Sequence, residues 1–325
     1  MSIARNEGAG WQRTSVRSMA VVLPVAAVAA LVAGKWTMIN TSAGQLGSAD
    51  GEWIAVACLA AFMTWVFSAT ALQGAVIERM PPGLLLAAQF AASAANHILP
   101  AGVGGNAVNL RFLVRRGLTP TRSVAALAVR ACAAAIGRIV LLLAVLGLFP
   151  GALHLHRVTG GGPEIPDHPL LIAGVGAAIA AGVVVLVRCA RRLRERLRDF
   201  LGSVAHDVRV LRGNRARMAA LWGGSLAFPA MHAAVLVSVA RAVHAPVPVS
   251  GVVVAYLFAS TAAGWLPTPA GLGSLDAALG LALITAGASA VAATSAVLGY
   301  RLVTTWLPLM PGVLVLAMLV RRREL

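Results

Sequence analysis

The chain has 325 residues, of which 59% are hydrophobic and only 12% are charged, and its formal net charge is +16. A soluble domain usually carries about 25% charged residues, so this composition excludes a soluble globular protein and indicates an all-α integral membrane protein. The arginines stand in short runs between apolar segments, which is typical of cytoplasmic loops, and no nucleic-acid-binding pattern accompanies them. We therefore expect membrane lipids, and no nucleic acid, as partners.

Six segments are apolar and long enough to cross a membrane, which takes about 20 residues. They predict a single polytopic membrane domain, 1–325, with about six full transmembrane helices. In chain order the segments are 18–39, 53–77, 121–150, 169–188, 218–240 and 290–320.

The distribution of arginines predicts which side of the membrane each connection faces, because basic loops stay cytoplasmic. The basic segments are the two chain ends, the region 78–122 and the loop 188–217. We expect these in the cytoplasm of a cell with the protein in its plasma membrane. The loops 40–52, 151–168 and 241–249 carry little basic charge and are expected outside.

Two further apolar stretches are each interrupted by a Pro/Gly-rich hexamer, PAGVGG at 100–105 and PAGLGS at 269–274. Proline and glycine are the residues least suited to a helix interior. The charge pattern requires 83–117 to enter and leave on the cytoplasmic side, and 250–288 to enter and leave outside. We expect two re-entrant helical hairpins whose tips contain Pro100, Gly102, Gly104, Gly105, Pro267, Pro269, Gly271 and Gly273.

The two halves of the chain resemble each other beyond these hexamers. FAASAANHILPAGVGG begins at Phe90 and FASTAAGWLPTPAGLGS begins at Phe258, and an arginine follows each. The pattern predicts an inverted-topology repeat, with repeat 1 over about 18–152 and repeat 2 over about 169–320. Such repeats are a recurrent plan of secondary transporters, with the substrate site between them. The alternative is a structural relic, because Gly/Pro motifs also pack ordinary membrane helices.

Arg130 and Arg301 occupy matching positions in the two repeats. Arg130 lies about 13 Å from the cytoplasmic end of its helix at 1.5 Å per residue, and Arg301 lies at a comparable depth from the outside. A guanidinium group binds phosphate oxygens through a planar fork, so both are candidate ligands for a lipid phosphate. Capping of the carbonyls of a broken helix is an equal alternative.

Three other polar residues complete the candidate substrate site. Asp276 begins a half-helix, where capping of free N–H groups is the favoured role, while pairing with Arg301 and carrying a proton stay open. Asn106 occupies the matching place in the first hairpin. Arg138 lies two turns beyond Arg130 and needs a partner that the sequence does not identify.

The sequence contains no catalytic motif, P-loop or metal-ligand spacing. We therefore expect no enzymatic activity, no cofactor and no metal site, and no transport powered by this chain's own ATP hydrolysis.

LPTPAGLGSLDAAL followed by YRLVTTWLPLMPGVL resembles the second signature of the flippase-like family, also called the lysylphosphatidylglycerol synthase transmembrane region. Ala270 replaces a glycine of that signature and Asp276 replaces its glutamate. The matching residues are Pro267, Pro269, Gly271, Gly273 and Arg301. The first signature is matched by Pro100, Gly104, Gly105 and Arg130, with Asn106 near a position that is commonly acidic.

The resemblance implies a membrane region that, in lysyl-phospholipid synthases, is joined to a soluble aminoacyltransferase domain and is associated with flipping of the modified lipid. We expect no synthase domain here, because the sequence ends at Leu325 directly after its last helix. The expected function is translocation of a phospholipid or a polyprenyl-linked lipid. The alternative is a non-transporting partner or scaffold of a lipid-modifying enzyme or glycosyltransferase.

Overall fold

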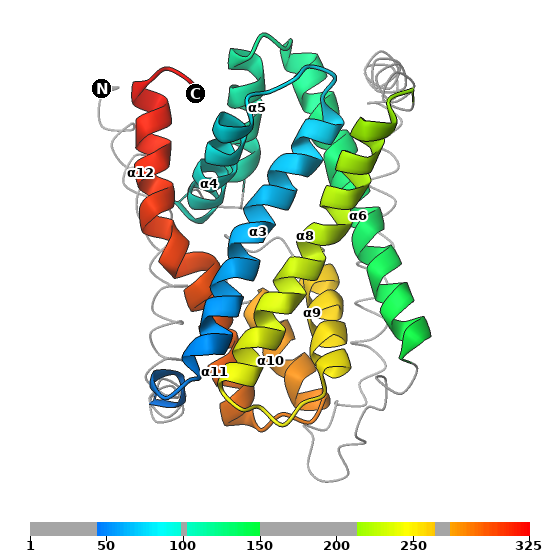
Figure 1. Ribbon diagram of the computed structural model, residues 1–325, viewed down its shortest axis with the longest axis vertical. Coiled ribbons are helices and arrows are strands. Elements are labelled where there is room, and N and C mark those ends of the chain that lie inside the picture. The colour runs from blue at the N-terminus through cyan, green and yellow to red at the C-terminus, as the bar shows by residue number, and fades with distance from the viewer. Residues whose placement is uncertain (1–43, 99–102, 150–212, 264–273) are drawn as a thin grey trace, which may run out of the picture.

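The computed structural model describes residues 44–98, 103–149, 213–263 and 274–325. Within these ranges every regular element is a helix, which confirms the all-α class (Figure 1). The helices are α3 (Gly51–Ala75), α4 (Pro82–Ile98), α5 (Gly104–Arg115), α6 (Pro120–Leu148), α8 (Arg215–Ala242), α9 (Val249–Ala263), α10 (Ser274–Thr285), α11 (Ala290–Arg301), η4 (Leu302–Trp306) and α12 (Leu307–Arg321).

Four of these helical runs are long and apolar enough to cross a membrane: α3, α6, α8 and the continuous run Ala290–Arg321 that joins α11, η4 and α12. They match four of the expected spans to within a few residues. The other two, 18–39 and 169–188, lie outside the described residues, so the total of six spans stays a prediction.

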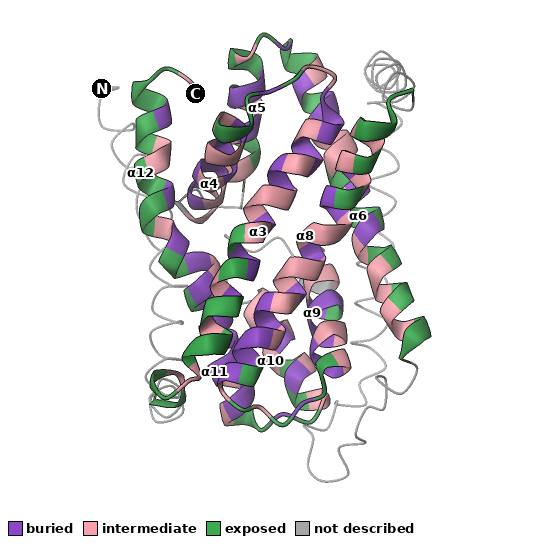
Figure 2. Cartoon of the chain, in the orientation of Figure 1, coloured by how far each residue is buried: buried purple, intermediate pink, exposed green. Residues whose placement is uncertain are grey.

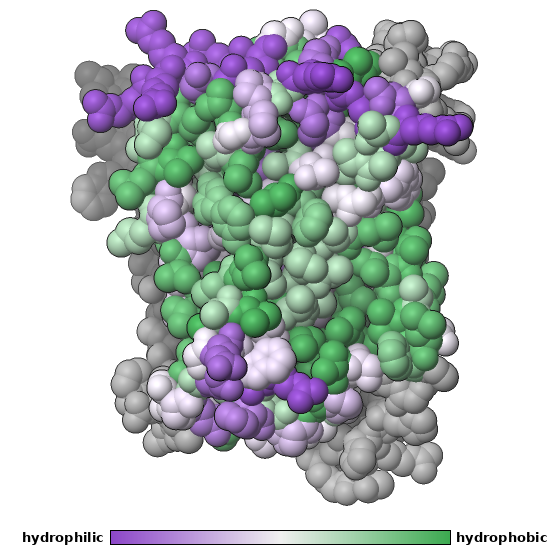
Figure 3. Space-filling model, in the orientation of Figure 1, coloured by the Kyte–Doolittle hydropathy of each residue, from purple (hydrophilic) through white to green (hydrophobic). Residues whose placement is uncertain are grey.

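The outer surface is that of a protein embedded in lipid. Figure 3 shows an apolar band between two hydrophilic ends. The outward faces of α6 and α12 are exposed (Figure 2) and carry large apolar side chains, among them Leu143, Met310 and Leu314. An exposed apolar surface of this extent indicates contact with another apolar phase rather than with water.

The two central helices, α3 and α8, lie side by side through the middle of the molecule (Figure 1) and make the most extensive helix–helix contact in the described chain. Glycines allow their backbones to touch. A Cβ atom on Gly74 would lie 2.2 Å from the backbone nitrogen of Leu221, and one on Gly224 would lie 2.6 Å from that of Ala71. Close backbone approach through small residues is the usual way for membrane helices to associate.

Two pairs of short helices pack at opposite ends of the molecule, α4 with α5 at the top of Figure 1 and α9 with α10 at the bottom. In the first pair the contact is very close, since a Cβ atom on Gly104 would lie 2.0 Å from the carbonyl oxygen of Ala95. Gly104 and Gly105 form the first residues of α5. The other expected tip residues, Pro100, Gly102, Pro267, Pro269, Gly271 and Gly273, lie outside the described residues.

The last long helical run is interrupted by the π-helical turn η4, directly after Arg301. Pro308 has no N–H group and cannot donate to the carbonyl of Thr304, so a regular α-helix cannot continue unchanged through this point. At the same place the Thr304 hydroxyl donates to the carbonyl of Tyr300, one turn earlier, at 2.7 Å. Single π turns of this kind are frequent at functional sites.

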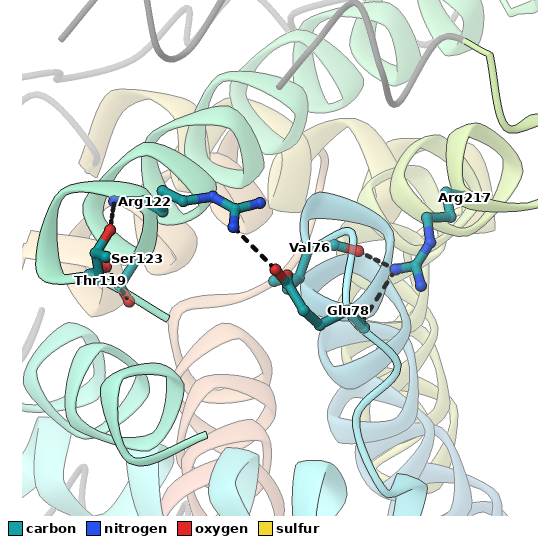
Figure 4. Close-up of polar contacts among 6 residues, drawn as sticks. All are labelled: Val76, Glu78, Thr119, Arg122, Ser123 and Arg217. Atoms are coloured by element: carbon teal, nitrogen blue, oxygen red, sulfur yellow. Dashed lines mark hydrogen bonds and ion pairs between the residues drawn. The ribbon is translucent and has the colours of Figure 1, made fainter. Parts of the chain in front are cut away.

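A cluster of polar contacts fixes the end of α3 at the arginine-rich end of the molecule (Figure 4). The Arg217 guanidinium, at the start of α8, donates to the carbonyls of Gln73, Val76 and Glu78. The Glu78 carboxylate pairs with Arg122 of α6 at 3.1 Å. Carbonyls at the end of a helix have no partner within it, so Arg217 satisfies them and ties α3 to α8.

The glycine contact predicts different effects for two adjacent positions in α8. Gly224→Ala places a methyl group against the α3 backbone, and we expect it to destabilise the fold by about 1–3 kcal/mol through overpacking. Gly223→Ala is the matched control, because no atom lies within 4 Å of its Cβ position, and it should be neutral or stabilising by up to about 1 kcal/mol. Thermal unfolding in detergent checks both, and equal midpoints would show that the close approach is not required.

Candidate functional site

A cavity of about 340 Å³ lies between α3, α4, α5, α6 and α8, with η4 at its edge. Its lining is rich in polar side chains although the surrounding helices are apolar. Ser68 lies about 10 Å along α3 from its end at Ala75, and Arg130 lies about 15 Å along α6 from its start at Pro120. Polar groups at such depth are costly unless they serve a protected or hydrated space, so this cavity is the candidate functional site.

A continuous hydrogen-bonded chain runs along one wall of the cavity and draws one residue from each of four helices. The Arg130 Nη2 group donates to the Ser68 hydroxyl at 2.6 Å. The Ser68 hydroxyl donates to the Gln89 Oε1 atom at 2.9 Å, and the Gln89 Nε2 group donates to the Asn109 Oδ1 atom at 2.9 Å. Ser68, Gln89 and Asn109 are all buried, so the chain is a structural element of the bundle.

Arg130 sets the direction of every bond in this chain. A guanidinium has donors only, so the Ser68 oxygen accepts from it and the Ser68 proton is directed to Gln89. Gln89 therefore presents its oxygen to Ser68 and its nitrogen to Asn109. The Asn109 oxygen accepts this bond, so within the described part of the protein the Asn109 NH₂ group stands at the end of the hydrogen-bonded chain. Each residue of this chain accepts a hydrogen bond from the side of Arg130 and donates one on the other side, so the bonds polarise one another. The donor at the end of the chain can therefore bind a group that accepts hydrogen bonds.

The beginning of α5 adds further donors to the same cavity. The Gly105 N–H group donates to the Asn96 Oδ1 atom at 3.1 Å, and Gly105, Asn96 and Asn106 all line the cavity. The preceding residue, Val103, provides no side-chain cap for the helix. The first N–H groups of a helix lack intrahelical partners and carry the positive end of its dipole. The positive end of the α5 dipole thus lies at the cavity that Arg130 also lines.

Arg301 has a different environment from Arg130, its counterpart in the repeat predicted from the sequence. Its guanidinium forms a two-pronged ion pair with Asp276, Nε to Oδ1 at 2.5 Å and Nη2 to Oδ2 at 3.1 Å. Arg301 is buried and does not line the cavity. Of the roles left open for Asp276 by the sequence, pairing with Arg301 is therefore present in the structure.

His232 connects the cavity with this ion pair. Its ring lines the cavity, and its Nδ1 atom lies 2.9 Å from the hydroxyl oxygen of Tyr300, the residue before Arg301. Phe228 and Tyr256 pack against the same ring, at 4.7 Å and 5.9 Å between ring centroids. The hydrogen bond and the aromatic contacts hold His232 in a fixed orientation between the two arginine environments.

The sequence-predicted site residues thus fall into separate groups. Arg130 and Asn106 meet in the cavity, and Asp276 and Arg301 meet in the ion pair. Arg138 belongs to neither pair: it is not among the residues that line the cavity, and its Nε atom is buried without a hydrogen-bond partner among the described residues.

The sequence interpretation missed four residues that define the cavity: Ser68, Gln89, Asn96 and Asn109. A signal was present, because Gln89 and Asn96 are amides within an otherwise apolar segment, where a polar side chain needs a partner. Within the part of the chain that the structure describes, no group of three or more His, Cys, Asp or Glu residues is placed to hold a metal ion.

A second, larger hollow of about 630 Å³ lies between α3, α4 and α8. Its walls are mainly apolar, with Val66, Leu85 and Leu86 among them, and Arg79 and Arg217 lie at one end. An apolar groove with cationic side chains at its end has the amphipathic character of a lipid: acyl chain along the walls and anionic group at the arginines.

The family model of the Lysylphosphatidylglycerol synthase TM region matches residues 17–312, so the chain belongs to this family. The match covers both Pro/Gly hexamers and both arginines of the predicted repeat, and it confirms the resemblance read from the second signature. No curated protein matches the sequence.

The ion pair between Asp276 and Arg301 predicts a specific pattern of stability. Asp276→Asn removes the carboxylate charge but keeps the size of the side chain, and we expect a loss of about 3 kcal/mol because the buried Arg301 charge loses its carboxylate. The double variant Asp276→Asn/Arg301→Gln removes both charges and should recover part of this loss. Thermal unfolding of the single and double variants in detergent measures the energetic coupling between Asp276 and Arg301. If the destabilisation in the double variant equalled the sum of the two single effects, the predicted coupling would be contradicted.

Proposed function

From membership of this family, we propose that the chain is a lipid translocator of the plasma membrane, in which a lipid headgroup passes through the polar cavity while its acyl chains stay in the apolar phase. The observation that carries the proposal is the chain of donors from Arg130 to Asn109, which lines a cavity inside apolar helices. A headgroup needs such a polar route because each desolvated polar group costs several kcal/mol in hydrocarbon.

The chemistry of the cavity favours a phosphate group as the part of the lipid that binds there. Arg130 provides a permanent positive charge with a planar fork of donors, and the start of α5 adds N–H groups and a positive dipole end. In this mechanism Arg130 binds the phosphate, and Asn96 and Asn106 contact the remainder of the headgroup. The arginine-ended groove between α3, α4 and α8 would accommodate an acyl chain on the same side.

The arrangement of the short helices supports an inverted repeat with two re-entrant hairpins. The α4–α5 and α9–α10 pairs lie at opposite ends of the molecule (Figure 1), and their bounds follow the expected segments closely. The end that contains α5 is strongly hydrophilic (Figure 3) and carries the arginines at the helix ends there, including Arg79, Arg115, Arg122, Arg217 and Arg321. By the positive-inside rule, we propose that this end faces the cytoplasm.

The second candidate function is that of a non-transporting partner that presents a lipid to a lipid-modifying enzyme or glycosyltransferase. One observation favours it: Arg301 is paired with Asp276 and does not line the cavity, so only one of the two repeat arginines is open to a ligand. A presenting protein needs one open site, whereas a translocator needs a route to both surfaces.

Reconstitution into vesicles with labelled lipids tests the proposal. We expect Arg130→Ala to slow headgroup movement by about 10- to 100-fold, since hydrogen bonds to a charged group contribute about 1.5–3 kcal/mol and 1.4 kcal/mol is tenfold. Arg130→Lys should be intermediate, because it keeps the charge but not the fork. Arg122→Ala, which removes a half-exposed arginine outside the cavity, is the control and should move lipid at the normal rate.

Two outcomes would contradict the assignment in different ways. If a folded Arg130→Ala variant moved labelled lipid at the normal rate, Arg130 would not bind the headgroup during translocation. Vesicles with the unaltered chain that move no labelled lipid would overturn the translocator and favour the presenting partner, which co-purification with a lipid-modifying enzyme would then test.

A further inference from the structure

The cavity has an unbalanced charge. Arg130 is the one formally charged side chain among its described lining residues. Each acidic residue in the described ranges lies elsewhere. Asp50 caps α3, Glu52 is exposed in the first turn of α3, and three others pair with arginines outside the cavity: Glu78 with Arg122, Asp276 with Arg301 and Glu324 with Arg116. The sequence of the segments 99–102 and 264–273 contains no acidic residue either.

This imbalance determines which headgroups the cavity can hold at low cost. A phosphodiester brings one negative charge, which neutralises Arg130. An ammonium group brings a second positive charge into a space whose described lining offers it no carboxylate, and a buried charge without a partner is strongly unfavourable. Repulsion between two like charges is also larger in a site shielded from water than in bulk solvent. Ammonium-bearing headgroups are therefore disfavoured at this site.

The remaining lining matches uncharged hydroxyl groups. The Asn106 side chain lines the cavity and makes no hydrogen bond within the described chain, and the Asn96 NH₂ group is not used by its contact with Gly105. Amides both donate and accept, as hydroxyl groups do. A cavity of about 340 Å³ has room for about ten water molecules at about 30 Å³ each, which suits a phosphate joined to glycerol or to one sugar ring.

We propose that the cavity selects lipids whose headgroup is a single phosphodiester with uncharged hydroxyl groups, and that it discriminates against headgroups that carry an ammonium group, whatever their net charge. The proposal rests on the proposed function, because it names the lipid class that the same cavity would move. Its physical basis is one guanidinium surrounded by amides and hydroxyls, with no carboxylate among the described lining residues.

Phosphatidylglycerol and phosphatidylserine separate this proposal from simple attraction of anions, since both have one net negative charge and only the serine headgroup carries an ammonium group. Short-chain dihexanoyl forms of each are titrated against the full chain in detergent, with bound lipid counted by native mass spectrometry. We expect phosphatidylglycerol to bind about tenfold or more tightly than phosphatidylserine. Equal affinities for the two lipids would overturn the proposal.

Asn106→Asp adds a carboxylate to the described lining of the cavity, which has none, without changing the size of the side chain. We expect this variant to bind phosphatidylglycerol more weakly. The ratio of its affinities for phosphatidylglycerol and phosphatidylserine should fall about tenfold. Gln45→Glu is the matched control, because it makes the same amide-to-carboxylate change at an exposed position outside the cavity and can still accept from Ser295. The proposed selectivity would be overturned if Asn106→Asp left this affinity ratio unchanged, or if Gln45→Glu lowered it by the same factor.

Vesicle assays with the same two lipids keep this proposal distinct from the proposed function. Movement of both lipids at equal rates would support a translocator and overturn the selectivity. Selective binding of phosphatidylglycerol without movement of either lipid would support the selectivity and overturn the translocator.

Discussion

The close crossing of α3 and α8 is the contact on which the rest of the structure depends. With glycine at Gly74 and Gly224, the two backbones touch, and neither helix could rotate or withdraw without breaking that fit. The same two helices provide Ser68 and His232 to the lining of the cavity. The packing of this central pair therefore contributes to the shape of the cavity, together with α4, α5 and α6, which supply the rest of its lining.

Arg130 and Arg301, which the sequence comparison matches, meet the same physical requirement in two different ways. A guanidinium within membrane helices needs hydrogen bonds and compensation of its charge. Arg301 obtains both from one carboxylate, Asp276. Arg130 obtains hydrogen bonding from Ser68 and the amides behind it, which are neutral, so its charge remains available to a ligand. The sequence comparison places Asp276 and Asn106 near corresponding positions, and this difference accompanies the difference between Arg301, which pairs with a carboxylate, and Arg130, which bonds to neutral groups.

The sequence predicts the helices better than the site. Long apolar runs limited by prolines and arginines define α4 and α6 to within a few residues, because the length of a membrane span and the positive-inside rule are properties of local sequence. The cavity depends instead on which helix faces meet. Ser68, Gln89 and Asn109 are about 20 residues apart from one to the next, and nothing local indicates that they form one chain. The family match identifies the architecture but not this network.

The contrast between the arginines also constrains any route across the membrane. A phosphate bound at Arg130 that moved on to Arg301 would have to replace the Asp276 carboxylate, exchanging one anion for another at the same guanidinium. Such an exchange conserves charge at Arg301 but releases the Asp276 carboxylate, which then needs a proton or another cation while it stays within apolar surroundings. His232 and Tyr300 lie between the two arginine environments, joined by a hydrogen bond. If a headgroup follows the proposed route, its passage over Arg301 would therefore require compensation of the charge of Asp276.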